Sequence, residues 1–230
     1  MENKKAAIYH FTDGGNIRPI VYTKEIERIK QFAVKAGYPD TEVYLDKSLK
    51  KKERLQFQKL MLEAKNFQAL FLKDFYHIGK NTGAFMDDLI SLSTQGVNVY
   101  TIEDGYFQLE PAPFEKPLKV AIYYCGLEIT NRSIGFQYEV MEYFIQTCTK
   151  WQLIDEYADS FGNKSDKNQK QLQELIRNNY KYDIILVQSF NDIHWRTARF
   201  CKVRQQIQKD IYSMHEQIYL KFEQEVKNEE

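Results

Sequence analysis

Carboxylates stand at the ends of two apolar runs in the first part of the chain. Asp13 lies two residues beyond the run 6–11, and Asp46 directly follows the run 42–45. Mg²⁺ accepts carboxylates in such places, and an aspartate there can also accept a phosphoryl group. Asp13 and Asp46 are therefore candidates for a magnesium or phospho-acceptor site, although two acids alone are a weak metal signature.

Cations gather close to Asp46, in the run Lys50, Lys51 and Lys52 with Arg54 behind it. Such a run can contact nucleic-acid phosphates. The whole chain, however, balances 32 lysines and arginines against 32 aspartates and glutamates. Dedicated DNA-binding domains are usually basic, because phosphate neutralisation supplies much of their affinity. A strong stand-alone DNA binder is therefore not expected, and the lysine run is more typical of a solvated helix start.

Histidines and cysteines lack the spacing of metal ligands, so neither a metal nor another cofactor is expected. These residues are His10, His77, His194, His215, Cys125, Cys148 and Cys201. An odd number of scattered cysteines is typical of a reduced cytosolic protein. Because the N-terminus has no apolar signal core and no run reaches membrane-spanning length, we expect a soluble, cytoplasmic protein with no membrane partner.

Strands and helices alternate along both halves of the chain. Apolar runs predict strands at 6–11, 42–45, 69–72 and 97–102, then at 119–124, 153–157, 184–187 and 211–214. Helical spacing of apolar residues predicts helices at 23–36, 52–65 and 82–94, and further helices between the later strands. This order predicts a mainly parallel sheet covered by helices on both faces.

Segments of the first half return in the second half in the same order, at an offset of roughly 113 residues. Ala7-Ile8-Tyr9 returns as Ala121-Ile122-Tyr123, for example. We therefore predict two tandem α/β domains, at 1–107 and 118–230, each a mainly parallel sheet of four to five strands flanked by helices. The segment 108–117 holds Pro111, Pro113 and Pro117 and is predicted to be a short, stiff linker.

Both halves resemble the catalytic domain of serine recombinases, the resolvase and invertase family. The first strand of that domain carries Tyr-x-Arg-x-Ser. Its second strand ends in Asp and is followed by a helix with an arginine near its start. Its third strand is followed by Asp-Arg-Leu-x-Arg. The first half has Tyr9, Asp46, Arg54 and the segment 76–80 at these places, and the second half has Tyr123, Asp159 and the segment 191–195. The resemblance covers nearly the whole chain and implies two resolvase-like domains.

The chemistry of that family is missing from both halves. Strand transfer needs a hydroxyl nucleophile and arginines that stabilise charge on the scissile phosphate. Asp13 and Leu127 stand where the family has serine, and Lys80 alone keeps a positive charge in the later motif. The resemblance therefore implies a pseudoenzyme with no catalytic residues. Thr12 would be a nucleophile only in a shifted alignment, and no activating base or arginine cluster accompanies it.

Several residues could still line a residual phosphate- or DNA-binding cleft at the strand ends, where open α/β sheets bind ligands. They are Tyr9, Asp46, Lys50, Lys51, Lys52, Arg54 and Lys80. The competing interpretation is that Asp46 and Arg54 only hold a loop and a helix start. His10 and His77 fall near the same place and are expected to approach each other.

The leading hypothesis is a catalytically degenerate recombinase-like protein that acts by binding, as an accessory or regulatory protein in DNA recombination or mobile-element biology. Its partners would be DNA, bound weakly, and a recombinase or other protein, and its halves would form an intramolecular pseudodimer. Two alternatives stay open. One is a DNA strand-cleaving enzyme rebuilt on Thr12 or on a metal at Asp13 and Asp46, and the other is a phosphate- or nucleotide-binding α/β module.

Overall fold

Two compact units make up the chain. The computed structural model describes residues 4–12, 19–47, 54–126, 131–160 and 169–222. The first unit comprises residues 1–80 and 84–107, and the second comprises residues 81–83 and 108–230. Each unit has its own buried hydrophobic cluster.

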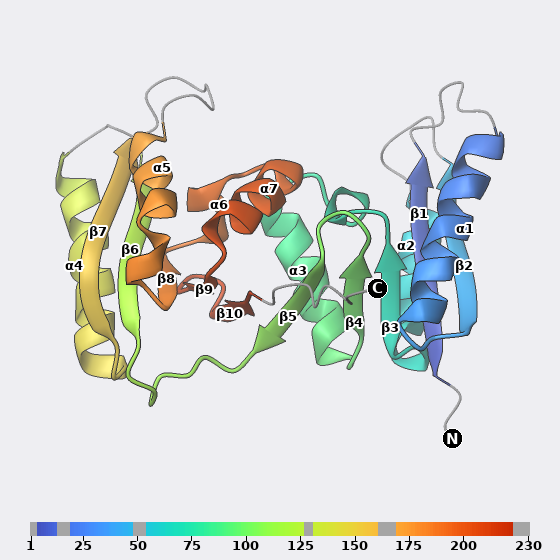
Figure 1. Cartoon of the computed structure of the whole chain (residues 1–230), viewed down its shortest axis with the longest axis horizontal. Coiled ribbons are helices and arrows are strands. Elements are labelled where there is room, and N and C mark those ends of the chain that lie inside the picture. The colour runs from blue at the N-terminus through green and yellow to red at the C-terminus, as the bar shows by residue number, and fades with distance from the viewer. Residues whose placement is uncertain (1–3, 13–18, 48–53, 127–130, 161–168, 223–230) are drawn as a thin grey trace. The chain divides into compact units, whose positions relative to one another are not determined.

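The first unit alternates strands and helices along the chain (Figure 1). Its strands are β1 (Lys5–Thr12), β2 (Asp40–Lys47), β3 (Ala69–Leu72), β4 (Asn98–Thr101) and the beginning of β5 (Tyr106–Glu110). Its helices are α1 (Pro19–Lys35), α2 (Leu55–Glu63) and all but the first two residues of α3 (Thr82–Thr94), with 3₁₀ turns η1 (Ala64–Asn66) and η2 (Phe75–His77).

The sheet of the first unit has the strand order β2-β1-β3-β4-β5. The β1 strand pairs in parallel with both β2 and β3, β3 pairs in parallel with β4, and β5 is antiparallel to β4. The chain therefore reverses its direction of winding between β1 and β3. In open α/β sheets the carboxyl edge at such a switch point is the usual place for a ligand.

Alternate residues of β1 face opposite sides of this sheet. Ala6 and Ile8 pack in the cluster that contains Ile29 and Ala33 of α1. Tyr9 faces the other side, where its ring centroid lies 5.0 Å from that of Phe57 of α2. Neighbouring side chains at the end of β1 consequently lie on opposite faces of the sheet, one covered by α1 and the other by α2.

The second unit repeats this order of elements. Its strands are β6 (Lys119–Gly126), β7 (Gln152–Ser160), β8 (Ile184–Val187), β9 (Asp210–Ser213) and β10 (Ile218–Lys221). Its helices are α4 (Asn131–Cys148), α5 (Lys170–Arg177), α6 (Phe190–Ile193) and α7 (Thr197–Ile207), with the 3₁₀ turn η3 (Asn179–Lys181). The strands follow the order β7-β6-β8-β9-β10, all parallel except β10.

Two short strands were not predicted from the sequence, β5 and β10. The segment 108–117, expected to be a linker, begins inside β5, because Gln108, Leu109 and Glu110 pair with β10 in the second unit. Proline can end a strand without preventing the residues before it from pairing. Among the described residues, no helix combines the length and apolar character needed to cross a membrane.

Candidate functional site

A hydrogen-bonded clamp joins the end of β1 to the start of α2. The Tyr9 hydroxyl donates to Asp46 Oδ2 at 3.1 Å, and Arg54 Nε donates to the Tyr9 oxygen at 3.2 Å. The Asp46 carboxylate also accepts the backbone N–H groups of Gln56 and Phe57, each at 3.0 Å. The first N–H groups of a helix have no partner within the helix, so Asp46 acts as their cap. Both of its oxygens are occupied by this role.

The Arg54 side chain points back into the fold. Its Nη2 donates to the His77 carbonyl at 2.6 Å, and its Nη1 donates to the Ile78 carbonyl. The guanidinium carbon lies 3.9 Å from the Phe57 ring centroid. Burial raises the pKa of Tyr9 well above its usual range even though the Arg54 cation opposes the shift. Each nitrogen of Arg54 thus donates to a group of the protein itself, and Tyr9 stays protonated.

The second unit builds the same clamp with a neutral residue. The Tyr123 hydroxyl donates to Asp159 Oδ2 at 3.2 Å, and Asp159 caps α5 by accepting the N–H groups of Gln171 and Leu172. Gln169 occupies the position that is equivalent to Arg54. Its Nε2 lies 3.2 Å from the Tyr123 hydroxyl and 3.3 and 3.1 Å from the carbonyls of Asp192 and Ile193. The clamp therefore needs hydrogen-bond donors at this position but no charge.

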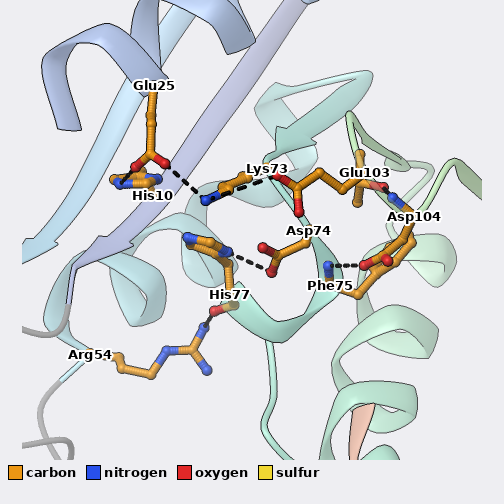
Figure 2. A network of polar contacts seen from close by, with 10 residues as sticks. His10, Glu25, Arg54, Lys73, Asp74, Phe75, His77, Glu103 and Asp104 are labelled. Atoms are coloured by element: carbon orange, nitrogen blue, oxygen red, sulfur yellow. Dashed lines mark hydrogen bonds and ion pairs between the residues drawn. The ribbon is translucent and has the colours of Figure 1, made fainter. Parts of the chain in front are cut away.

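A second group of polar side chains gathers at the switch point, on the α1 side of the sheet (Figure 2). We call it the switch-point cluster, and its members are His10, Glu25, Lys73, Asp74, His77 and Glu103. Glu25 of α1 lies 3.3 Å from His10 Nε2 through one oxygen and 2.8 Å from Lys73 Nζ through the other. His77 Nδ1 lies 2.8 Å from Asp74 Oδ1.

The two histidines of the cluster lie against each other, with ring centroids 5.0 Å apart. Their expected approach is therefore confirmed. His10 is only 2% exposed, and its Nδ1 has no hydrogen-bond partner. Burial, together with the neighbouring His77, lowers the pKa of His10 to about 4. The ring is therefore neutral at pH 7.

Negative charge dominates the switch-point cluster. Burial opposes ionisation of Glu25, but the hydrogen bond and charge of Lys73 hold its pKa below the usual range. Burial opposes ionisation of Asp74 as well, but its bond with His77 outweighs burial and lowers its pKa. The hydrogen bond to Glu25 raises the pKa of Lys73. With Glu103 3.9 Å from the same lysine, three carboxylates face one lysine, an arrangement that repels phosphate.

The structure brings together three of the residues predicted for the site, Tyr9, Asp46 and Arg54, and places them in the clamp. Lys80 is exposed, with its Nζ 5.4 Å from the Tyr76 ring centroid. Asp13 and the run Lys50, Lys51 and Lys52 lie outside the described residues.

Sequence reasoning missed Glu25, Lys73 and Asp74. Lys73 and Asp74 do carry a usable signal, because they directly follow a strand whose four residues are all buried. Charged residues in that place point to the carboxyl edge of the sheet. Thr12, at the end of β1, is buried. Within the described ranges, no three histidine, cysteine or acidic side chains are placed to hold a metal ion.

No family model matches the sequence, and no curated protein matches it. The structure is similar to catalytic domains of serine recombinases. The N-terminal catalytic domain of TP901-1 integrase is 24% identical, with a TM-score of 0.36, and the match covers 44% of this chain and 80% of that one. A resolvase family site-specific recombinase from Streptococcus pneumoniae is 19% identical, with a TM-score of 0.39, over 63% of this chain and 90% of that one.

A different class of protein matches over more of the chain. The Caulobacter myo-inositol binding protein, in a structure bound to myo-inositol, is 12% identical with a TM-score of 0.31, over 92% of this chain and 75% of that one. TM-scores of this size do not distinguish one class from the other. A choice of function therefore depends on the chain's own residues.

Proposed function

We propose that this chain is a recombinase-like protein that no longer cuts DNA and acts by binding, as an accessory or regulatory protein in DNA recombination or mobile-element biology. It would consist of two tandem copies of one domain. The repeated order of elements and the repeated clamp support the duplication. Pairing of the two copies as an intramolecular pseudodimer stays a prediction.

The observation that carries the proposal is the exchange of Arg54 for Gln169 in otherwise equivalent clamps. Each side chain donates to a buried tyrosine and to two consecutive carbonyls after the third strand of its unit. A phosphate-binding site would require the positive charge, since a cation attracts phosphate where an amide does not. What both units keep is the hydrogen bonding that holds the helix start, which is a structural role.

A rebuilt cleaving site finds no support in the described residues. Both Asp46 oxygens are engaged as a helix cap, so the carboxylate is poorly disposed to hold a metal. Among the described residues, no base forms a hydrogen bond with the Thr12 hydroxyl, and the negative charge of the switch-point cluster opposes the approach of a scissile phosphate. The same charge disfavours the phosphate- or nucleotide-binding alternative at this edge of the sheet.

The test combines DNA binding with DNA cleavage. Fluorescence anisotropy of a labelled duplex is measured over a series of salt concentrations for the wild type and for Arg54→Gln. Supercoiled plasmid is incubated with both proteins, with and without Mg²⁺. We expect no nicking. We also expect the two proteins to show the same salt dependence, because a lost phosphate contact would lower its slope by about one unit.

Nicking by the wild-type protein would refute the proposal. So would a loss of DNA affinity in Arg54→Gln without any loss of thermal stability, because Arg54 would then contact phosphate. Lys80→Gln is the matched variant. Lys80 is exposed, so a shallower salt dependence in this variant alone would place weak DNA contacts on the surface, outside the clamp.

A further inference from the structure

An open groove of about 560 Å³ runs along α2 of the first unit. It is lined by Arg54, Phe57, Gln58, Met61, Leu62 and Asp88, the last of these on α3. The volume is in the range of sites that hold several side chains or a small ligand. The aromatic ring and two aliphatic side chains make its wall largely apolar.

Two leucines extend this apolar surface into solvent. Leu55 is 60% exposed and Leu62 is 81% exposed. They are seven residues apart, two helical turns, and so lie on one face of α2. A single exposed leucine is unremarkable in a soluble protein, but two on one face of a helix that borders an apolar groove are more typical of an interaction site.

A carboxylate without a partner lies in the groove. Burial raises the pKa of Asp88 to about 6, with a further contribution from Asp87 and against the pull of the Arg54 cation. No ion pair joins Asp88 to Arg54, whose three nitrogens donate to Tyr9, His77 and Ile78. A half-buried carboxylate that forms no ion pair carries a desolvation cost, which the nearby Arg54 cation offsets only in part and which a further cation from a partner would reduce.

The second unit shows that the fold does not require these residues. At the same positions α5 has Lys170 and Arg177 in place of Leu55 and Leu62, both exposed, and α7 has a buried valine, Val203, in place of Asp88. The second unit thus has the ordinary arrangement, with charge outside and an apolar residue inside. The first unit reverses it at all three positions.

We propose that this groove binds an amphipathic helical segment of a protein partner, which places an arginine or lysine against Asp88 and apolar side chains against Leu55, Met61 and Leu62. Apolar walls with one unpaired acid complement a helix that presents one cation within an apolar face. The inference shares with the proposed function only the premise that the chain acts by binding. Because its test contains no DNA, the two can fail separately.

The test uses a fluorescein-labelled amphipathic helical peptide with leucines at one-turn spacing and a single arginine among them. The matched peptide has citrulline, a neutral isostere, in place of the arginine. We expect saturable binding of the arginine peptide to the full-length protein, weakened about tenfold or more by citrulline, since a charge-assisted hydrogen bond to a partly buried acid is worth roughly that factor. Absence of saturable binding, or equal affinity for both peptides, overturns the proposal.

Protein variants are taken from the second unit, whose residues the fold already tolerates. Leu62→Arg and Asp88→Val should each weaken peptide binding about tenfold, again by loss of one apolar anchor or one charge contact. Val34→Arg is the control, because Val34 of α1 is 55% exposed and lies outside the groove. Equal loss of binding in Val34→Arg would mean nonspecific association and would overturn the proposal.

Thermal stability gives a readout that does not depend on the peptide. Asp88→Val removes a half-buried carboxylate whose burial outweighs the attraction of Arg54, so we expect the melting temperature to rise while binding falls, the signature of a residue kept for function. A fall in melting temperature would make Asp88 a structural group. A dimer that forms at high concentration and is lost in Leu62→Arg, without peptide binding, would assign the groove to a second copy of the chain and overturn the proposal.

Discussion

Replacing His10 by glutamine should remove an acid-sensitive element from the first unit. His10 faces Glu25 of α1 through Nε2, and it lies beside His77, Lys73 and Asp74 from the segment after β3. A neutral ring protonated on Nε2 donates to Glu25 and leaves Nδ1 as a buried acceptor without a partner. Protonation adds a buried donor at Nδ1 with nothing to accept it, a costly state.

The pKa of His10 is about 4 in the folded chain, against 6.5 for an exposed histidine. This difference sets the direction and the size of the pH dependence of stability. Between these values the unfolded chain binds the proton and the folded chain does not. Stability is therefore complete above pH 6.5, falls as the pH decreases, and has lost the full contribution below pH 4. A shift of this size corresponds to roughly 3 kcal/mol at about 1.4 kcal/mol per unit.

Other groups titrate in the same range, so the prediction concerns the difference between wild type and His10→Gln. Burial raises the pKa of Asp88 to about 6 and that of Asp192 to about 7, which favours the folded state as the pH falls. Glu25 and Asp74, with lowered pKa values, act in the opposite direction near pH 4. These contributions are largely common to both proteins and cancel in the difference.

The assay is urea unfolding at several pH values, followed by far-UV circular dichroism. Tryptophan fluorescence is unsuitable, because Trp151 and Trp195 both belong to the second unit. The free energy of unfolding of the wild type, minus that of His10→Gln, should rise by about 2–3 kcal/mol between pH 4 and pH 7. Parallel stability curves for the two proteins would refute the assignment of a buried, neutral His10.

Two further changes test the backbone and the clamp. Arg54→Ala leaves two carbonyls and a buried tyrosine without donors and should lower the free energy of unfolding by about 3 kcal/mol. Arg54→Gln should lower it by only about 1 kcal/mol or less. Equal losses for the two variants in urea unfolding would contradict the equivalence of Arg54 and Gln169. Gln217 has φ of +56° in the β9–β10 turn, where the first unit has Gly105 at +80°. Gln217→Gly should therefore increase the free energy of unfolding by about 0.5–1 kcal/mol, measured as a rise in the melting temperature.

Elements with a continuous apolar run or a clear helical spacing could be predicted from the sequence, and strands without such a pattern could not. The helix expected at 82–94 is α3, and the strand expected at 69–72 is β3. The strand β5 was read as part of a linker, although Phe107 and Leu109 alternate with polar residues, because three prolines follow closely. Whether such a short segment pairs depends on its tertiary neighbours, here β4 and β10, which no local pattern reveals.

The candidate site was predicted only in part, for a geometric reason. Tyr9, Asp46 and Arg54 meet because parallel strands end at one edge of a sheet, which the order of elements already implies. Whether their side chains turn inward or toward a ligand depends on hydrogen bonds to specific carbonyls, which the sequence does not specify. Glu25 could not be assigned for a similar reason, since its approach to His10 requires the rotation of α1 against the sheet.

The two units differ at three equivalent positions that bear on the proposed sites. His10, Arg54 and Asp88 of the first unit correspond to Tyr124, Gln169 and Val203 of the second, which are neutral. Each neutral residue fits the same local structure, so folding does not demand the titratable ones. Two of those three, moreover, carry a cost in the first unit: His10 has an unpartnered Nδ1, and Asp88 is half-buried with a raised pKa, because the attraction of Arg54 does not outweigh burial.

A neutral residue at such a position should improve stability, so residues that carry this cost are candidates for a role in binding. Arg54 carries no comparable cost, since its nitrogens all have acceptors, which agrees with the structural role proposed for it. These features fit the partner site proposed for the groove beside α2 of the first unit. The second unit, which keeps the same clamp with Gln169 in place of Arg54, preserves the architecture.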